Sequence, residues 1–112
     1  MNHNLIHIGQ DFEWFLGKFD NNQRHKHYAI QLSIPLQGKI NLITNHSKIT
    51  TKQAILIKPN TEHLLESEHE HLLILLNPAS TIGHFWNRLT NPPFSEINNE
   101  PIILIRKLGL NF

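Results

Sequence analysis

Turn-forming sequences recur at short intervals along the first 78 residues, and this recurrence constrains the fold more than any other feature of the chain. The turns separate short runs rich in apolar and aromatic residues, which span 5–8, 12–19, 28–35, 40–44, 54–58 and 72–77. No helical periodicity precedes residue 78. This spacing is typical of an antiparallel sandwich or barrel and argues against alternating βαβ units. We therefore expect an all-β domain, with a β-hairpin that bends at Gly38.

A short helix is expected after Pro78, which ends the last apolar run. Ser80 or Thr81 can cap this helix at its N-terminus. Its apolar residues would be Ile82, Phe85, Trp86 and Leu89. We expect Phe85 and Trp86 to hold the helix against the β-structure.

The last part of the chain contains an irregular stretch over 90–99 and then a second apolar segment. Pro101 and Gly109 are placed to begin and end a helix there. Because an isolated short helix is marginal in water, this segment needs a partner surface, and a homodimer would supply one. The chain is thus expected to form one domain over 1–112, with a barrel over about 1–78 and a helical tail over about 79–112.

Charge and composition exclude several classes of function. Ten Lys and Arg residues nearly balance nine Asp and Glu residues, giving a formal net charge of +1, so this chain alone is not expected to bind DNA. No cysteine is present, which excludes disulfides and thiolate metal sites. The N-terminus does not resemble a signal peptide, and the longest apolar run, at 72–76, is too short to cross a bilayer. We therefore expect a cytoplasmic protein without membrane contacts.

Nine histidines are the most unusual feature of the composition. Residues two apart on a strand share a face, so His25, His27, Gln31 and Ser33 are expected on one face of the strand at 28–35 and its approach. The opposite face would carry Tyr28, Ile30, Leu32 and Ile34. His63 follows a tight turn in which Asn60 can take a left-handed conformation. His63 can therefore converge with the first pair of histidines.

This arrangement resembles the two sequence motifs of the cupin superfamily. The first motif places His-x-His, an acidic residue after three or four positions and Gly after six more, and HKHYAIQLSIPLQG fits these gaps with His25, His27, Gln31 and Gly38. In the second motif a Pro-Gly turn leads to His, and KPNTEH supplies Asn60 in the glycine position and His63. Gln replaces the usual Glu, and the later Asn of the second motif is missing. The resemblance implies a cupin jelly-roll β-barrel followed by one or two C-terminal helices.

The segments AILIKPNTEHLLES and HLLILLNPAS (54–67 and 71–80) are most similar to the N-terminal domain of AraC-type transcription regulators. The resemblance implies a domain that binds a small-molecule effector and dimerises, while a separate pair of helix-turn-helix motifs binds DNA. No such pair follows the barrel within 112 residues, so the chain is either a sensor domain of a longer regulator or a free-standing cupin. The sequence leaves the identity of the effector open.

A divalent metal is the alternative occupant of the predicted barrel. His25, His27, His63 and the amide oxygen of Gln31 can together bind zinc, nickel or iron. Gln is a neutral and weaker ligand than Glu, and AraC-type sensors usually lack the metal, so the same residues can instead form a hydrogen-bonded ligand site. Whether the chain is an enzyme stays open. The alternative function is a stand-alone, metal-dependent cupin enzyme of the dioxygenase or isomerase type, for which the sequence identifies no catalytic residue.

Other aromatic and histidine residues are weaker candidates. Trp14 ranks first among the non-histidine candidates for lining a ligand pocket, although core packing is the more common fate of such residues. His69 and His71, in EHEH, are expected in a solvated turn before the strand at 72–77. The remaining histidines that lack a sequence partner are expected at the surface, and these are His3, His7, His46 and His84.

Overall fold

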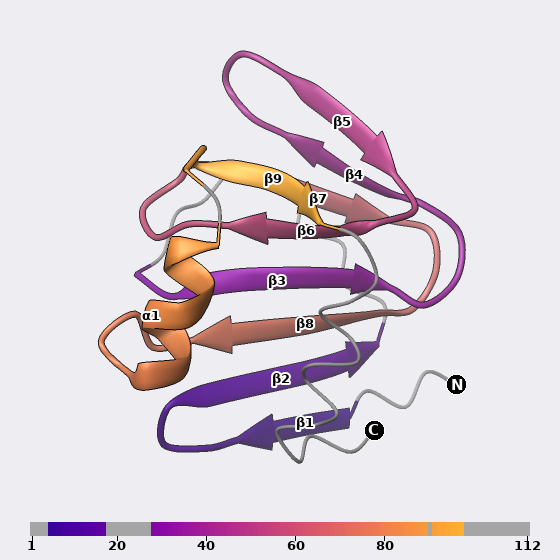
Figure 1. Cartoon of the computed structure of the whole chain (residues 1–112). Helices are drawn as coiled ribbons and strands as arrows, with labels where there is room; N and C mark the ends of the chain where they lie inside the picture. The colour runs from indigo at the N-terminus through magenta and orange to yellow at the C-terminus, as the bar shows by residue number, and fades with distance from the viewer. Residues whose placement is uncertain (1–4, 18–27, 90, 98–112) are drawn as a thin grey trace.

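The computed structural model describes residues 5–17, 28–89 and 91–97, and these form two antiparallel sheets and one helix (Figure 1). The larger sheet has six strands in the order β1-β2-β8-β3-β6-β9, and the smaller has three in the order β5-β4-β7. The strands are β1 (Leu5–Ile8), β2 (Phe12–Gly17), β3 (Ile30–Pro35), β4 (Ile40–Ile43), β5 (Lys48–Thr51), β6 (Ala54–Ile57), β7 (Leu64–Ser67), β8 (His71–Leu76) and β9 (Phe94–Ile97), and the helix is α1 (Thr81–Arg88). Strands that are consecutive in the sequence often lie in different sheets, as in a jelly roll.

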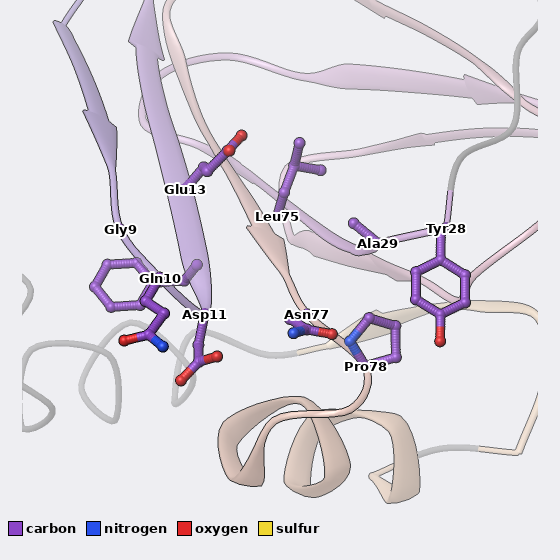
Figure 2. Close-up of a pocket in the computed structure, with 10 residues that line it drawn as sticks. Gly9, Gln10, Asp11, Glu13, Tyr28, Ala29, Leu75, Asn77 and Pro78 are labelled. Carbon is purple, nitrogen blue, oxygen red and sulfur yellow. The ribbon is translucent and has the colours of Figure 1, made fainter.

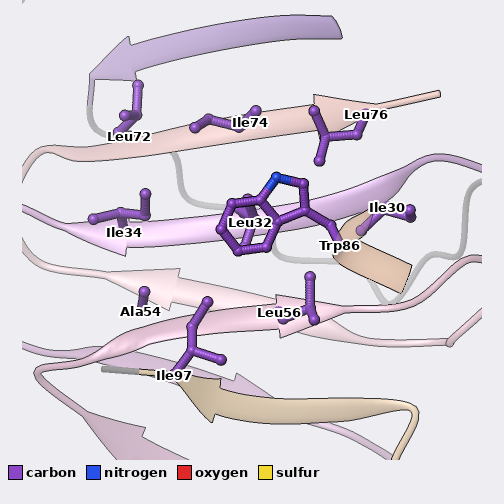
Figure 3. Packing of buried hydrophobic residues seen from close by; sticks show 10 residues of the cluster. All are labelled: Ile30, Leu32, Ile34, Ala54, Leu56, Leu72, Ile74, Leu76, Trp86 and Ile97. Atoms are coloured by element: carbon purple, nitrogen blue, oxygen red, sulfur yellow. The ribbon is translucent and has the colours of Figure 1, made fainter. Parts of the chain in front are cut away.

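One face of the six-stranded sheet, here called the outer face, is almost wholly apolar. Alternate residues of β3, β8, β6 and β9 gather there with Trp86 of α1 in one buried cluster, which comprises Ile30, Leu32, Ile34, Ala54, Leu56, Leu72, Ile74, Leu76, Trp86 and Ile97. Figure 3 shows the indole ring lying over the strands in the middle of this cluster. Burial of this many branched side chains is the main source of stability on this side.

The opposite face, here called the inner face, is turned toward the three-stranded sheet. A second buried cluster joins the two sheets and consists of Ile40, Leu42, Ile55, Ile57 and Leu65, with Phe94 packed against it. This apolar packing covers β6 and β9. On β3 the same face carries Gln31 and Ser33, which pair in register with Ile57 and Ile55. The inner face is therefore apolar over β6 and β9 and polar at β3.

The helix begins where the sequence predicts it. Ser80 is the N-cap, and its hydroxyl oxygen accepts a hydrogen bond from the backbone N–H of Gly83 at 3.0 Å. Trp86 is buried as expected, but Phe85 is 48% exposed, so the prediction that both aromatic residues hold the helix is wrong for Phe85. One turn of helix cannot direct two successive side chains to the same face. No helix within the described ranges is long and apolar enough to span a membrane.

The hairpin predicted at Gly38 is not present. β3 pairs with β6 and β8, whereas β4 pairs with β5 and β7 in the other sheet. Gly38 has φ of 74°, and the bend there carries the chain from one sheet to the other. A hairpin does join β4 to β5, closed by the Thr44 N–H donating to the Ser47 carbonyl at 2.8 Å.

Three short strands were not expected from the sequence. β5 and β7 lie in segments interpreted as turn or connection, and β9 lies in the stretch predicted to be irregular. β9 extends the large sheet by pairing with β6, from Ala54 opposite Ile97 to Ile57 opposite Phe94. The second helix predicted after Pro101 lies outside the described residues.

Candidate functional site

The candidate site is a short chain of buried polar side chains on the inner face of β3. Gln31 and Ser33 are 3% and 0% exposed, although their neighbours Ile30, Leu32 and Ile34 point to the outer face. This alternation confirms the predicted division of the strand between two faces. The Gln31 amide nitrogen donates to the Ser33 hydroxyl oxygen at 2.9 Å. That bond turns the amide oxygen of Gln31 away from Ser33.

His63 reaches this amide from the loop between β6 and β7. Asn60 adopts the left-handed conformation predicted from its position, with φ of 60°, and the chain then turns back toward β3. The His63 side chain is 1% exposed. Its Nε2 lies 3.2 Å from Gln31 Oε1, and its Nδ1 lies 2.7 Å from the backbone carbonyl oxygen of Thr61. The structure thus brings together two residues that are 32 positions apart.

The hydrogen-bond partners restrict the protons that this pair can carry. A carbonyl oxygen only accepts, so His63 Nδ1 carries the proton shared with Thr61. In neutral His63 the lone pair of Nε2 then faces the amide oxygen of Gln31, which is also an acceptor. The contact is favourable when a proton or a cation lies between the two atoms, or when the amide turns over and its NH₂ group donates to Nε2. Binding of a ligand can select among these states.

The same geometry is compatible with coordination of a divalent ion. A metal-bound histidine commonly donates its other ring N–H to a carbonyl oxygen, as His63 does through Nδ1. Two ligand atoms on one tetrahedral zinc ion, each about 2.1 Å from the metal, lie roughly 3.4 Å apart. The distance of 3.2 Å between His63 Nε2 and Gln31 Oε1 is close to that value. Among the described residues alone, no three His, Asp or Glu side chains form a metal-binding group.

Partly exposed apolar side chains lie beside the polar chain. β8 directs Leu73 and Leu75 to the inner face, where they pair in register with Ser33 and Gln31 of β3. On the other side of β8, Phe15 of β2 pairs with Leu73. These three side chains are half-buried, whereas those on the outer face of β8 are fully buried. The inner face over β2 and β8 therefore offers an apolar surface next to hydrogen-bonding groups, the usual composition of a ligand site.

The remaining predicted site residues do not all join this group. His25 and His27 lie outside the described residues, so their convergence with His63 stays a prediction. Trp14 is half-buried and packs against the outer-face cluster, on the opposite side of the sheet from Gln31. Because a strand alternates its side chains, Trp14 cannot share the inner face with its neighbours Glu13 and Phe15. The structure therefore does not bring Trp14 to the site.

One inner-face residue was missed by the sequence interpretation. His71 was predicted in a solvated turn, but it is the first residue of β8 and is 0% exposed, so that prediction is wrong. It pairs in register with Gly17 of β2 and Pro35 of β3 and points to the inner face. Counting back by twos from Leu75 would have identified it. His46 and His84 are exposed, as expected.

Comparison with solved structures shows that the fold is similar to that of cupin structures. The chain is similar to a Streptococcus pyogenes protein of unknown function (TM-score 0.59, 17% identity, covering 71% of this chain and 77% of that one). It is also similar to a cupin superfamily protein from Desulfitobacterium hafniense (TM-score 0.57, 14% identity, 68% and 77% covered). A third match is a cupin 2 conserved barrel domain protein from Salinispora arenicola (TM-score 0.55, 9% identity, 76% and 82% covered).

Because the sequence identities are low, these likenesses show the fold and nothing finer. The mostly antiparallel β-structure with one short helix matches the cupin jelly roll, as the sequence predicted. A scan of protein-family models finds no match to the chain, and neither does a search of curated proteins.

Proposed function

We propose that this cupin-fold domain binds a small molecule at the inner face of β3 and is the effector-binding, dimerising domain of an AraC-type transcription regulator. The observation that carries the proposal is the buried chain of Ser33, Gln31 and His63. Cupin metal sites usually hold a carboxylate at the position of Gln31. Replacement of that charge by an amide favours hydrogen bonding to a polar ligand over binding of a bare cation.

The chemistry of the inner face suits a small ligand with polar and apolar parts. Gln31 and His63 can donate or accept as their amide and ring protons rearrange, so they can pair with a hydroxyl or carbonyl group. Leu73, Leu75 and Phe15 supply the apolar surface beside them. Ligand pockets commonly combine an apolar lining with a few polar groups that fix orientation. The resemblance to AraC-type sensors in the segments 54–67 and 71–80 connects this site to regulation.

Thermal denaturation in the presence of a panel of sugars, aromatic acids and amines tests ligand binding. We expect at least one class to raise the melting temperature of the native chain, because a ligand that binds only the folded state stabilises it. His63→Ala should remove that shift, and the matched variant His46→Ala, at an exposed histidine, should keep it. A shift that survives in His63→Ala would contradict the proposed site.

Two further measurements test the regulatory part of the proposal. Sedimentation of the chain at high micromolar concentration should show a dimer, and a strict monomer would argue against a dimerising domain. A gel shift should show no sequence-dependent, salt-resistant binding of duplex DNA, because the net charge is only +1. Specific binding by this chain alone would contradict its assignment as a sensor domain.

The second candidate function is a metal-dependent cupin enzyme. The hydrogen bond from His63 Nδ1 to the Thr61 carbonyl favours it, because this bond leaves Nε2 as the atom available for coordination. Gln31 Oε1 would be a second ligand, and a bound zinc, nickel or iron ion would supply Lewis-acid or oxygen chemistry. Tight binding of such an ion by the native chain would move this function ahead of the sensor.

A further inference from the structure

A pocket of about 280 Å³ opens at one end of the inner face, where β2 and β3 begin and β8 ends. This volume is that of about nine water molecules in the liquid. The lining residues come from three separate segments and are Gly9, Gln10, Asp11, Phe12, Glu13, Tyr28, Ala29, Leu75, Asn77 and Pro78. Figure 2 shows Leu75 standing between Glu13 on one side and Ala29 and Tyr28 on the other.

Every formal charge in the lining of this pocket is negative. Asp11 and Glu13 contribute two carboxylates, and no Lys, Arg or His is among the lining residues. Within the part of the chain that the structure describes, neither carboxylate has a hydrogen bond or an ion pair; Asp11 uses only its backbone carbonyl, which accepts from the Asn77 N–H. Glu13 is half-buried and Asp11 is exposed. A cation at the pocket would neutralise two carboxylates that have no opposite charge in the lining.

The rest of the lining can hold an uncharged body next to such a cation. Leu75 and Pro78 supply apolar contacts, and the Tyr28 ring is 66% exposed at the rim. An aromatic face attracts a cation as well as apolar groups. Gln10 and Asn77 offer neutral amides. This mixture fits a compact organic amine better than a hydrated metal ion, which would leave the apolar surface in contact with water.

The pocket and the polar chain of the candidate site lie on the same face of the large sheet. Glu13 pairs in register with Leu75, and Leu75 pairs with Gln31 on its other side. Glu13 and Gln31 therefore stand on the same face two strands apart, about 10 Å at the usual strand spacing. From this arrangement we infer that the ligand of the inner face is a primary amine whose ammonium group pairs with Glu13 and Asp11 while its body lies over Leu75. The inference rests on the proposed function, since it takes that ligand to reach this pocket.

Three compounds of nearly equal size test the inference in the full chain at low ionic strength. The amide NMR spectrum is titrated with phenethylamine, 2-phenylethanol and 3-phenylpropionate, which differ in the charge of the terminal group. We expect phenethylammonium to bind at least fivefold more tightly than the alcohol, and the carboxylate to bind most weakly. Glu13→Gln, which keeps size and removes charge, should abolish the preference for the amine, and Glu62→Gln, at an exposed carboxylate outside the pocket, should retain it.

Equal binding of the amine and the alcohol by the native chain would overturn the inference, as would a preference for the amine that persists in Glu13→Gln. The proposed function fails in a different way. If Glu13→Gln abolishes the preference but no ligand of any class depends on His63, the pocket selects amines and the site at Gln31 and His63 is not used. If a ligand depends on His63 but amines have no advantage, the sensor proposal stands and the ammonium inference falls.

Discussion

The two faces of β3 carry side chains that are equally buried but chemically opposite. Leu32 and Ser33 are adjacent, and both are 0% exposed. Leu32 packs in the apolar outer-face cluster, whereas Ser33 accepts a hydrogen bond from Gln31 on the inner face. Burial alone therefore does not tell which residues hold the fold together. The outer face has the composition of a core, and the inner face keeps buried polar groups that an apolar core would avoid.

The largest expected effect lies on the outer face. Trp86→Ala should lower the free energy of unfolding by about 3–5 kcal/mol, because it removes a fully buried indole from the contact between α1 and the sheet. Chemical denaturation followed by circular dichroism measures this loss. Phe85→Ala is the matched control on the same helix, where 48% exposure predicts a loss of less than about 1 kcal/mol. Equal losses would mean that α1 is not held by Trp86.

A second prediction concerns how closely α1 approaches the end of β8. A Cβ atom on Gly83 would collide with the backbone carbonyl oxygen of Asn77, which cannot move away as a side chain can. Gly83→Ala should therefore cost about 1–3 kcal/mol, although alanine is the better helix former. His84→Ala, at an exposed position of the same helix, should be neutral or slightly stabilising. A stabilised Gly83→Ala variant would show that the helix can shift outward at little cost.

The smallest effect on stability is expected on the inner face. Ser33→Ala removes the acceptor for the Gln31 amide and should cost about 1 kcal/mol. Leu32→Ala, one residue away and equally buried, should cost about 2–5 kcal/mol. Denaturation curves of the two variants compare the two faces of one strand directly. A loss for Ser33→Ala as large as that for Leu32→Ala would make the polar chain a structural element of the core.

The fold class could be predicted from the sequence, but the strand pairing could not. Turn spacing and the motif around Gly38 identified a jelly roll, and Ser80 and Asn60 behave as their local chemistry predicts. The prediction of a hairpin at Gly38 was wrong, because a local turn signal does not specify which strands pair with each other. β5, β7 and β9 were missed because their four-residue sequences are partly polar and lack an apolar run.

The site could be predicted in part, for similar reasons. Two-residue alternation correctly placed Gln31 and Ser33 on one face, and His63, which follows the turn at Asn60, lies against Gln31. The predicted convergence of His63 with His25 and His27 stays a prediction. Trp14, the first-ranked pocket candidate outside the histidines, packs on the outer face, because no motif in the sequence fixes the parity of β2 relative to β3. His71 was missed because three charged or polar residues precede it and suggest solvent, whereas tertiary packing buries it. Alternation within a strand is visible in the sequence, but the register between strands is not.

Metal titration tests most directly whether Gln31 has converted a metal-type geometry into a hydrogen-bonding site for an organic ligand. Calorimetry with zinc or nickel should show weak binding by the native chain and at least tenfold tighter binding by Gln31→Glu, about 1.4 kcal/mol or more, because Glu adds the missing negative charge. His63→Ala in the Gln31→Glu background should abolish the gain, since it removes Nε2 from the pair that lies 3.2 Å apart. Equally poor binding by native and Gln31→Glu would contradict the account, and so would tight binding by the native chain.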